Sequence, residues 1–418
     1  MLKRIGALTH DAIIVIGVTT ILFILANIAA AYDLKKHEHF PPWDPIWRSV
    51  INPGAPQGVA ILRQVFPDED TAQLKQRIQG LPYVLHPSLQ YAVPATDTPF
   101  THIGLENIRY HDGWSDDEVR RRLASDNLTI ILGGSTTFGH FLKNDETWPY
   151  YFDRLIETHG EVSLNFGTIA NDQEREIDRL VYELRRGVRP RRVIFFDGLN
   201  DMHLVANSNL RTGDRMLYET FVPSRGEVAV SDGLRLGERN WWRVLTEGLP
   251  ALKWLQQTLE SERTGDEVVY PRDVFTQGFD FREAEWARYF WYKWAPQHAA
   301  ELRTELIAQY RANLDFISHL SKTYGFEALV FYQPIGLLDP TNEFVTDATR
   351  RLPEYAFFAS LNDAVRAEIA AGRLAMIDLQ DALDPMPHLR YVDLAHYSPA
   401  ANQLIAAAIF ARVKPTNP

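Results

Sequence analysis

The sequence Leu128-Thr-Ile-Ile-Leu-Gly-Gly-Ser-Thr-Thr-Phe-Gly139 decides the fold, because a run of apolar and β-branched residues ends abruptly in small residues. Both faces of the run are apolar, which is typical of a parallel strand buried between two layers of helices. Gly133 and Gly134 allow the backbone to turn, and Ser135 follows directly. A hydroxyl just past such a strand lies where open α/β sheets bind their ligands. The stretch therefore predicts a candidate nucleophile, although a plain strand-to-helix turn or a phosphate-binding loop has the same pattern.

Predicted strands and helices alternate along the rest of the chain. Apolar runs predict strands at 128–132, 162–166, 193–196, 328–332 and 375–377. Apolar residues at helical spacing predict helices at 146–158, 172–186, 298–323 and 355–370. Ser398 can cap a last helix that has Pro399 at its first position. Strands separated by helices imply a parallel sheet with helices on both faces, so we predict a three-layer α/β/α, flavodoxin-like domain.

Three more short segments complete a set of four with the serine stretch. They are Asn165-Phe166-Gly167, Gly198-Leu199-Asn200-Asp201 and Asp393-Leu394-Ala395-His396. In this order, the four segments resemble the consensus blocks of the SGNH (GDSL-like) hydrolase superfamily over residues 126–412, and the order is more specific than any single motif. The family is named for a Ser, a Gly, an Asn and a His, and the matching positions are Ser135, Gly167, Asn200 and His396. One departure is Gly134, where the family often has Asp.

A serine nucleophile needs a base, and the base needs a third group that orients it. Asp393 and His396 lie three residues apart just before a helix, so the carboxylate can accept from one ring nitrogen while the other faces Ser135. We therefore predict Ser135, Asp393 and His396 as the catalytic residues. The resemblance implies an oxyanion hole formed by the backbone N–H groups of Ser135 and Gly167 and by the side-chain amide of Asn200.

Other polar residues near these blocks are given structural roles. We expect Asp201 to brace its loop, and His140 and His203 to lie on the surface rather than line a pocket. The sequence His37-Glu38-His39 resembles a metal-binding cluster only superficially, and a solvated turn is favoured. Neither a dinucleotide-binding loop nor a Walker sequence is present, so we predict no cofactor and no metal.

Composition excludes some classes of partner. The 418 residues carry a net charge of −11, which argues against nucleic-acid binding. Basic residues cluster at 120–122 and 185–192, beside acidic residues, and we interpret both clusters as solvated helix ends. The chain has no cysteine, which removes disulfides and thiolate chemistry but does not indicate a compartment.

Residues 12–31 form an uncharged apolar run that is long enough to cross a membrane as a helix. A cleaved signal peptide is the alternative, since Ala29 and Ala31 fit a cleavage pattern, but the length of the run favours a retained anchor. In both cases the serine lies outside the cytoplasm. We predict a single-pass protein of the bacterial inner membrane, with its catalytic domain in the periplasm.

The predicted domain organisation has five parts. A tail and anchor (1–35) are followed by a Pro-rich connector and N-terminal extension (36–125), extended to about residue 60 and with a short helix at 70–79. The hydrolase domain comprises 126–206 and 297–418, separated by an aromatic-rich insertion at 207–296. The insertion contains Trp241, Trp242, Trp254, Trp286, Trp291 and Trp294. These rings could cap the site, form a separate small core or present a face to a membrane partner, and packing is favoured.

Three functions are compatible with the sequence. The first is an esterase that removes an acyl group, such as acetyl, from an envelope glycan or a small ester. The second is an O-acyltransferase that passes the acyl group to a polysaccharide hydroxyl, a reaction of membrane-anchored relatives. The third is a non-catalytic, hydrolase-like subunit of a membrane protein complex, because fold does not fix function. The predicted partners are accordingly an ester substrate, the membrane and, in the third case, other membrane proteins.

Overall fold

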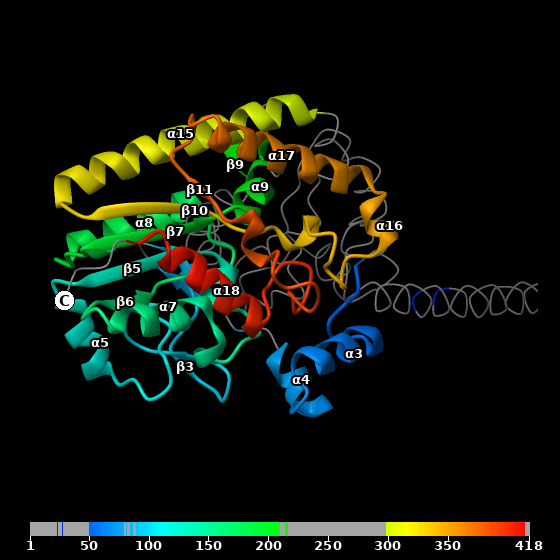
Figure 1. The fold of residues 1–418 in the computed structure, drawn as a ribbon, viewed down its shortest axis with the longest axis horizontal. Coiled ribbons are helices and arrows are strands. Elements are labelled where there is room, and N and C mark those ends of the chain that lie inside the picture. Colours follow the sequence, from blue (N-terminus) through cyan, green and yellow to red (C-terminus); the bar gives the residue numbers. More distant parts are fainter. Residues whose placement is uncertain are drawn as a thin grey trace, which may run out of the picture. The chain divides into compact units, whose positions relative to one another are not determined.

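A parallel five-stranded sheet forms the centre of the computed structural model, which describes residues 50–78, 81, 84–86, 89–206, 208–209, 214–215 and 298–413, together with Phe23 and Asn27. The strands run in the order β11-β10-β7-β5-β6, from top to bottom in Figure 1, and all neighbouring pairs are parallel. Their bounds are Leu128–Gly133 (β5), Val162–Asn165 (β6), Arg192–Asp197 (β7), Glu327–Tyr332 (β10) and Ile377–Asp378 (β11). The first strand therefore lies between the second and the third, as in flavodoxin-like sheets. The predicted parallel α/β sheet is confirmed.

Helices cover both faces of this sheet. The larger core cluster joins the sheet to α8 (Gln173–Arg185), α9 (Leu199–Ala206), α15 (Ala299–Tyr324) and α17 (Pro353–Ala370). The second cluster joins the opposite face to α7 (Trp148–Glu157) and α18 (Pro399–Phe410). Successive strand residues alternate between the clusters, with Ile130 in the first and Ile131 in the second. This alternation explains why β5 is apolar on both faces.

The helices begin at capping residues. Ser398 accepts a hydrogen bond from the backbone N–H of Ala401 and Pro399 is the first helical residue, as predicted. Thr147 caps α7 and Asp172 caps α8 in the same way. The predicted long helices agree with the observed bounds to within two residues.

The N-terminal extension contains more helix than its proline content suggests. Its elements are α3 (Pro56–Val65), α4 (Thr71–Arg77), β1 (Val84–His86), β2 (Gln90–Ala92), β3 (Thr96–Asp97), β4 (His102–Ile103), η1 (Leu105–Asn107) and α5 (Asp116–Leu123). The prediction of an extended chain to residue 60 is wrong for residues 56–60, because Pro56 starts a helix that buries Val59 and Leu62, while residues 36–49 lie outside the described part of the chain. The short helix predicted at 70–79 is α4, which Asp70 caps.

The remaining elements are short. They are α6 (Ser135–Phe138), η2 (Asn144–Glu146), β8 (Ser208–Asn209), β9 (Asp214–Arg215), η5 (Gly336–Leu338), α16 (Asp347–Arg350) and η6 (Gln380–Leu383). The predicted anchor at 12–31 lies outside the described residues except for Phe23 and Asn27, which are helical. The 37–39 cluster and nearly all of the 207–296 insertion also lie outside them, and the domain boundaries stay predictions. Within the described part of the chain, none of the helices combines the length and apolarity that a membrane crossing requires.

The interpretation of both basic clusters as solvated helix ends is wrong for one arginine in each. Arg122 is buried and its Nη1 lies 2.8 Å from Oδ1 of Asp153. Arg192 is buried on β7 and its Nη1 lies 2.6 Å from Oε2 of Glu161. These arginines face acidic residues on neighbouring elements, which a pattern within one segment does not reveal.

Candidate active site

Ser135 is the first residue of α6, immediately after the end of β5, and its side chain is half-buried. Its N–H group has no partner within the helix, because the first helical N–H groups have no carbonyl to bond. The residue before it must be small: a Cβ at Gly134 would lie 2.1 Å from Nδ2 of Asn200. The amide of Asn200 thus occupies the space that a side chain at position 134 would take. The structure brings Asn200 to the Ser135 turn.

Asp393 and His396 form a hydrogen-bonded pair. Oδ2 of Asp393 lies 2.7 Å from Nδ1 of His396, while Oδ1 accepts from the backbone N–H groups of Ala395 at 2.7 Å and His396 at 2.6 Å. Burial by itself raises the pKa of the Asp393 carboxyl, but the nearby His396 and the two N–H donors outweigh burial and hold this pKa below its ordinary value. Asp393 is thus an ionised acceptor that orients the imidazole.

The loop that follows Ser135 places His396 close to the serine turn. The backbone N–H of His140 donates to the carbonyl of Ser135 at 3.0 Å, and the His140 ring lies 5.2 Å from the His396 ring. The Phe141 ring lies 5.4 Å from the same imidazole. Nε2 of His396 is buried and, among the described residues, it has no hydrogen-bond partner, so no bond joins it to Ser135. Catalytic hydrogen bonds often form only when substrate is bound, and this geometry is compatible with that behaviour.

Two of the three predicted oxyanion donors are already hydrogen-bonded. The N–H of Gly167 donates to Oδ1 of Asn165 at 2.9 Å, and Nδ2 of Asn200 donates to the carbonyl of Asn171 at 2.7 Å. The amide of Asn200 has a second hydrogen to offer, whereas the single hydrogen of the Gly167 N–H is committed to Asn165. Gly167 can serve a substrate oxygen only if the side chain of Asn165 moves.

Buried carboxyl groups lie directly beneath the Asn200 loop. Asp201 accepts from the backbone N–H groups of Gln173 at 3.1 Å and Gly198 at 3.2 Å, which are bonds that fix this loop. Burial, and then the nearby Asp172, raise the pKa of Asp201 to about 7. Burial, and then the neighbouring Asp197, raise the pKa of Glu176 well above its ordinary value. The sequence analysis named only Asp201 of this cluster. The signal for its other members was the position of Asp172 and Asp197, which follow the second and third predicted strands.

The two histidines that we expected on the surface are both half-buried. His140 is half-buried beside His396, and burial, followed by the effect of His396, lowers the pKa of His140 to about 3. His203 on α9 lies 5.0 Å from the ring of Phe358 on α17, and burial lowers its pKa to about 4. Neither side chain is as exposed as the surface prediction implied, because the turn after α6 places His140 beside His396 and α9 packs His203 against α17. In the described ranges, His and acidic residues do not gather in a group of three or more that could hold a metal ion.

No protein-family model matches the chain, and no curated protein matches it. Several solved structures are similar to it. A variant of an acetyl xylan esterase from Geobacillus stearothermophilus is 12% identical, with 71% of this chain and 99% of that chain covered, at a TM-score of 0.32. An esterase from Pseudoalteromonas sp. is 13% identical, with 68% and 96% covered, at a TM-score of 0.30. A member of the lipolytic protein G-D-S-L family from Veillonella parvula is 12% identical, with 68% and 99% covered, at a TM-score of 0.29. At such low identities and TM-scores, no residue role passes from those proteins to this chain.

Proposed function

We propose that this chain is a serine esterase of the SGNH (GDSL-like) hydrolase superfamily. Ser135 is the nucleophile, His396 is the general base and Asp393 holds the imidazole in the required orientation. The observation that carries this proposal is the 2.7 Å hydrogen bond between Asp393 and His396 beside the loop that follows Ser135. That bond leaves Nε2 of His396 as the nitrogen that can accept a proton.

The reaction follows from these positions. Oγ of Ser135 attacks the ester carbonyl while its proton passes to Nε2 of His396, and the carbonyl oxygen becomes negative. The N–H of Ser135 and the second amide hydrogen of Asn200 are the donors available to that oxygen. Collapse of the tetrahedral intermediate breaks the bond to the alcohol, which leaves with the proton from His396. Water then repeats the sequence on the acyl-serine and releases the carboxylic acid.

The proposed substrate is an acyl ester, and acetyl is the group that we favour, on an envelope glycan or a small molecule. The apolar run at 12–31 supports a single-pass anchor in a bacterial inner membrane, with the catalytic domain in the periplasm. If the site excludes water from the acyl-serine, a sugar hydroxyl replaces water as the acceptor and the chain acts as an O-acyltransferase.

A second candidate is a non-catalytic, hydrolase-like subunit of a membrane protein complex. The hydrogen bond from Gly167 to Asn165 favours this candidate, since it removes a donor that an oxyanion hole would use. Hydrogen bonding of His396 to Ser135 is also absent within the described residues. The two candidates differ in one property that can be measured directly, the reactivity of Ser135.

The test is labelling of the purified full chain with a fluorophosphonate probe, together with hydrolysis of p-nitrophenyl acetate. We expect the wild type to show both, and Ser135→Ala to lose both while it remains folded. Ser360→Ala, on α17, is the matched control and should behave as the wild type. Folded wild-type protein that neither reacts with the probe nor cleaves the ester would refute the esterase proposal in favour of the non-catalytic subunit.

A further inference from the structure

Phe141 has an unusual backbone conformation next to the proposed catalytic histidine. Its φ of 68° lies in the left-handed region, which bulky residues rarely adopt, so the surrounding structure must hold it there. Its ring lies 5.4 Å from the His396 ring at an interplanar angle of 76°, and 3.9 Å from the ring of His140. The strained residue is therefore in edge-on contact with the imidazole.

Two buried arginines bind the carbonyl groups around Phe141. Arg77 donates from Nη1 to the carbonyl of Phe141 itself at 3.0 Å. Arg109 donates to the carbonyls of Gly139 and Leu142, both at 2.6 Å. With the carbonyl of Phe138, which Arg109 also binds at 2.5 Å, guanidinium groups from outside the segment fix four carbonyls between residues 138 and 142.

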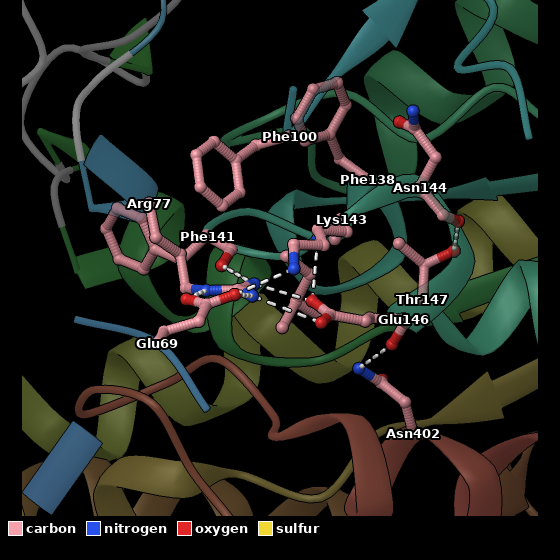
Figure 2. Close-up of polar contacts among 12 residues, drawn as sticks. Glu69, Arg77, Phe100, Phe138, Phe141, Lys143, Asn144, Glu146, Thr147 and Asn402 are labelled. Atoms are coloured by element: carbon pink, nitrogen blue, oxygen red, sulfur yellow. Dashed lines mark hydrogen bonds and ion pairs between the residues drawn. The ribbon is translucent and has the colours of Figure 1, made fainter. Parts of the chain in front are cut away.

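Arg77 belongs to α4 of the N-terminal extension, and Figure 2 shows it between two carboxylates. Its Nη2 and Nε bond to Glu69 at 2.5 and 2.9 Å, and its Nη1 and Nη2 bond to Glu146 at 2.6 and 3.1 Å. The guanidinium also lies 3.8 Å from the centre of the Phe66 ring. All five of its N–H donors have acceptors, so Arg77 is a rigid clamp rather than a mobile surface charge.

The hairpin α3–α4 packs against loops from both halves of the proposed site. Its apolar residues, including Leu62 and Leu74, share a cluster with Leu142, Phe344 and Val392. Leu142 follows the serine turn, Phe344 follows β10, and Val392 directly precedes Asp393 in the chain. The N-terminal hairpin therefore contacts the loops that carry both members of the Ser–His pair.

We propose that Arg77 is a positioning residue for His396, and that it acts through Phe141. By binding the carbonyl of Phe141, Arg77 keeps this residue in its left-handed conformation, and the ring then confines the imidazole close to Ser135. This inference rests on the proposed esterase function. It makes the segment between the predicted anchor and the hydrolase body a part of the catalytic apparatus rather than a passive connection.

The test compares two ways of releasing the imidazole in the full chain. The triple variant Arg77→Met/Glu69→Gln/Glu146→Gln removes the clamp without leaving buried carboxylates uncompensated. The variant Phe141→Gly removes the ring, and it relieves the backbone because glycine adopts positive φ readily, so it should fold even if the triple variant does not. Phe141→Tyr retains the ring, and Arg120→Met removes an exposed arginine of α5 as a matched control.

We expect kcat for p-nitrophenyl acetate to fall about tenfold to a hundredfold in the triple variant and in Phe141→Gly, with KM little changed. Phe141→Tyr should recover the rate that Phe141→Gly loses, and Arg120→Met should match the wild type. Thermal unfolding by circular dichroism identifies the variants that are folded. Wild-type kcat in the folded triple variant or in folded Phe141→Gly, or a loss that Phe141→Tyr does not recover, overturns this inference while the esterase proposal stands. A wild type without turnover overturns the esterase proposal and this inference together.

Discussion

Asp201 should make the folded protein less stable as the pH rises through the neutral range. Burial, and then the nearby Asp172, raise the pKa of this carboxyl from 3.8 to about 7. In the unfolded chain the same carboxyl loses its proton near pH 4, so between about pH 4 and pH 7 the folded state holds a proton that the unfolded state has released. The unfolding free energy therefore decreases with rising pH across this window, and the contribution of Asp201 is constant above it.

The variant Asp201→Asn isolates this contribution because an amide does not titrate. A tenfold change in proton affinity corresponds to about 1.4 kcal/mol, so a pKa rise from 3.8 to about 7 costs the folded wild type about 4 kcal/mol at alkaline pH. The amide also has a cost, since both carboxyl oxygens accept backbone N–H groups and an amide nitrogen cannot accept; one lost bond is worth about 1 kcal/mol. The variant should be about 1 kcal/mol less stable than the wild type below about pH 3, about as stable as the wild type near pH 4.5, and about 3 kcal/mol more stable at pH 8.

Urea unfolding followed by circular dichroism, at matched ionic strength and at pH 4.5 and 8, measures this change: the two proteins should be about equally stable at pH 4.5, and the variant should be the more stable at pH 8. Asp117→Asn is the control, because that carboxyl on α5 is 93% exposed, and its stability difference from the wild type should be the same at both pH values. If the difference between Asp201→Asn and the wild type also failed to change with pH, the buried carboxyl would not be the proton-binding group and the reasoning would be refuted.

Three further predictions concern the site and the core. Asp393→Asn should lower kcat for p-nitrophenyl acetate by about ten thousandfold because the imidazole loses its orienting acceptor; a loss below tenfold would contradict this role. Asn200→Ala should lower kcat by about a hundredfold to a thousandfold with little change in KM, and a change confined to KM would argue against an oxyanion donor. Arg192→Met should lower the unfolding free energy by about 3 to 5 kcal/mol in urea, because buried Glu161 loses its 2.6 Å partner, and Arg192→Met/Glu161→Leu should recover most of that loss.

The sheet and its helices could be predicted because their determinants are local. Ile130 and Ile131 face opposite core clusters, so burial on both sides is visible in β5 alone. Ser398 and Pro399 are adjacent in the sequence, and as the cap and the first helical residue they determine where α18 begins. The helix α3 was missed because Pro56 was interpreted as part of an extended connector, although apolar residues recur after it at helical spacing.

The site could be predicted only where its contacts are short in sequence. Asp393 and His396 are three residues apart, and the sequence alone places their side chains within reach. By contrast, Arg77 and Glu146 are 69 positions apart, and the pattern of one segment does not reveal a pairing with another. The same reason explains the error at Arg122, whose buried partner Asp153 is 31 positions away.

Contacts between residues that are far apart in the sequence also hold the proposed site together. Thr136, next to the proposed nucleophile, donates to Oε1 of Gln333 at 2.6 Å, and this bond spans 197 positions. Tyr397, next to the proposed base, reaches the same oxygen at 3.4 Å and the carbonyl of Pro334 at 2.6 Å. The segment after β10 therefore joins the two halves, so their placement relative to each other depends on β10 lying in the sheet. Because closing such long loops costs conformational entropy that only the complete core offsets, the site forms with the whole fold and not as a local motif.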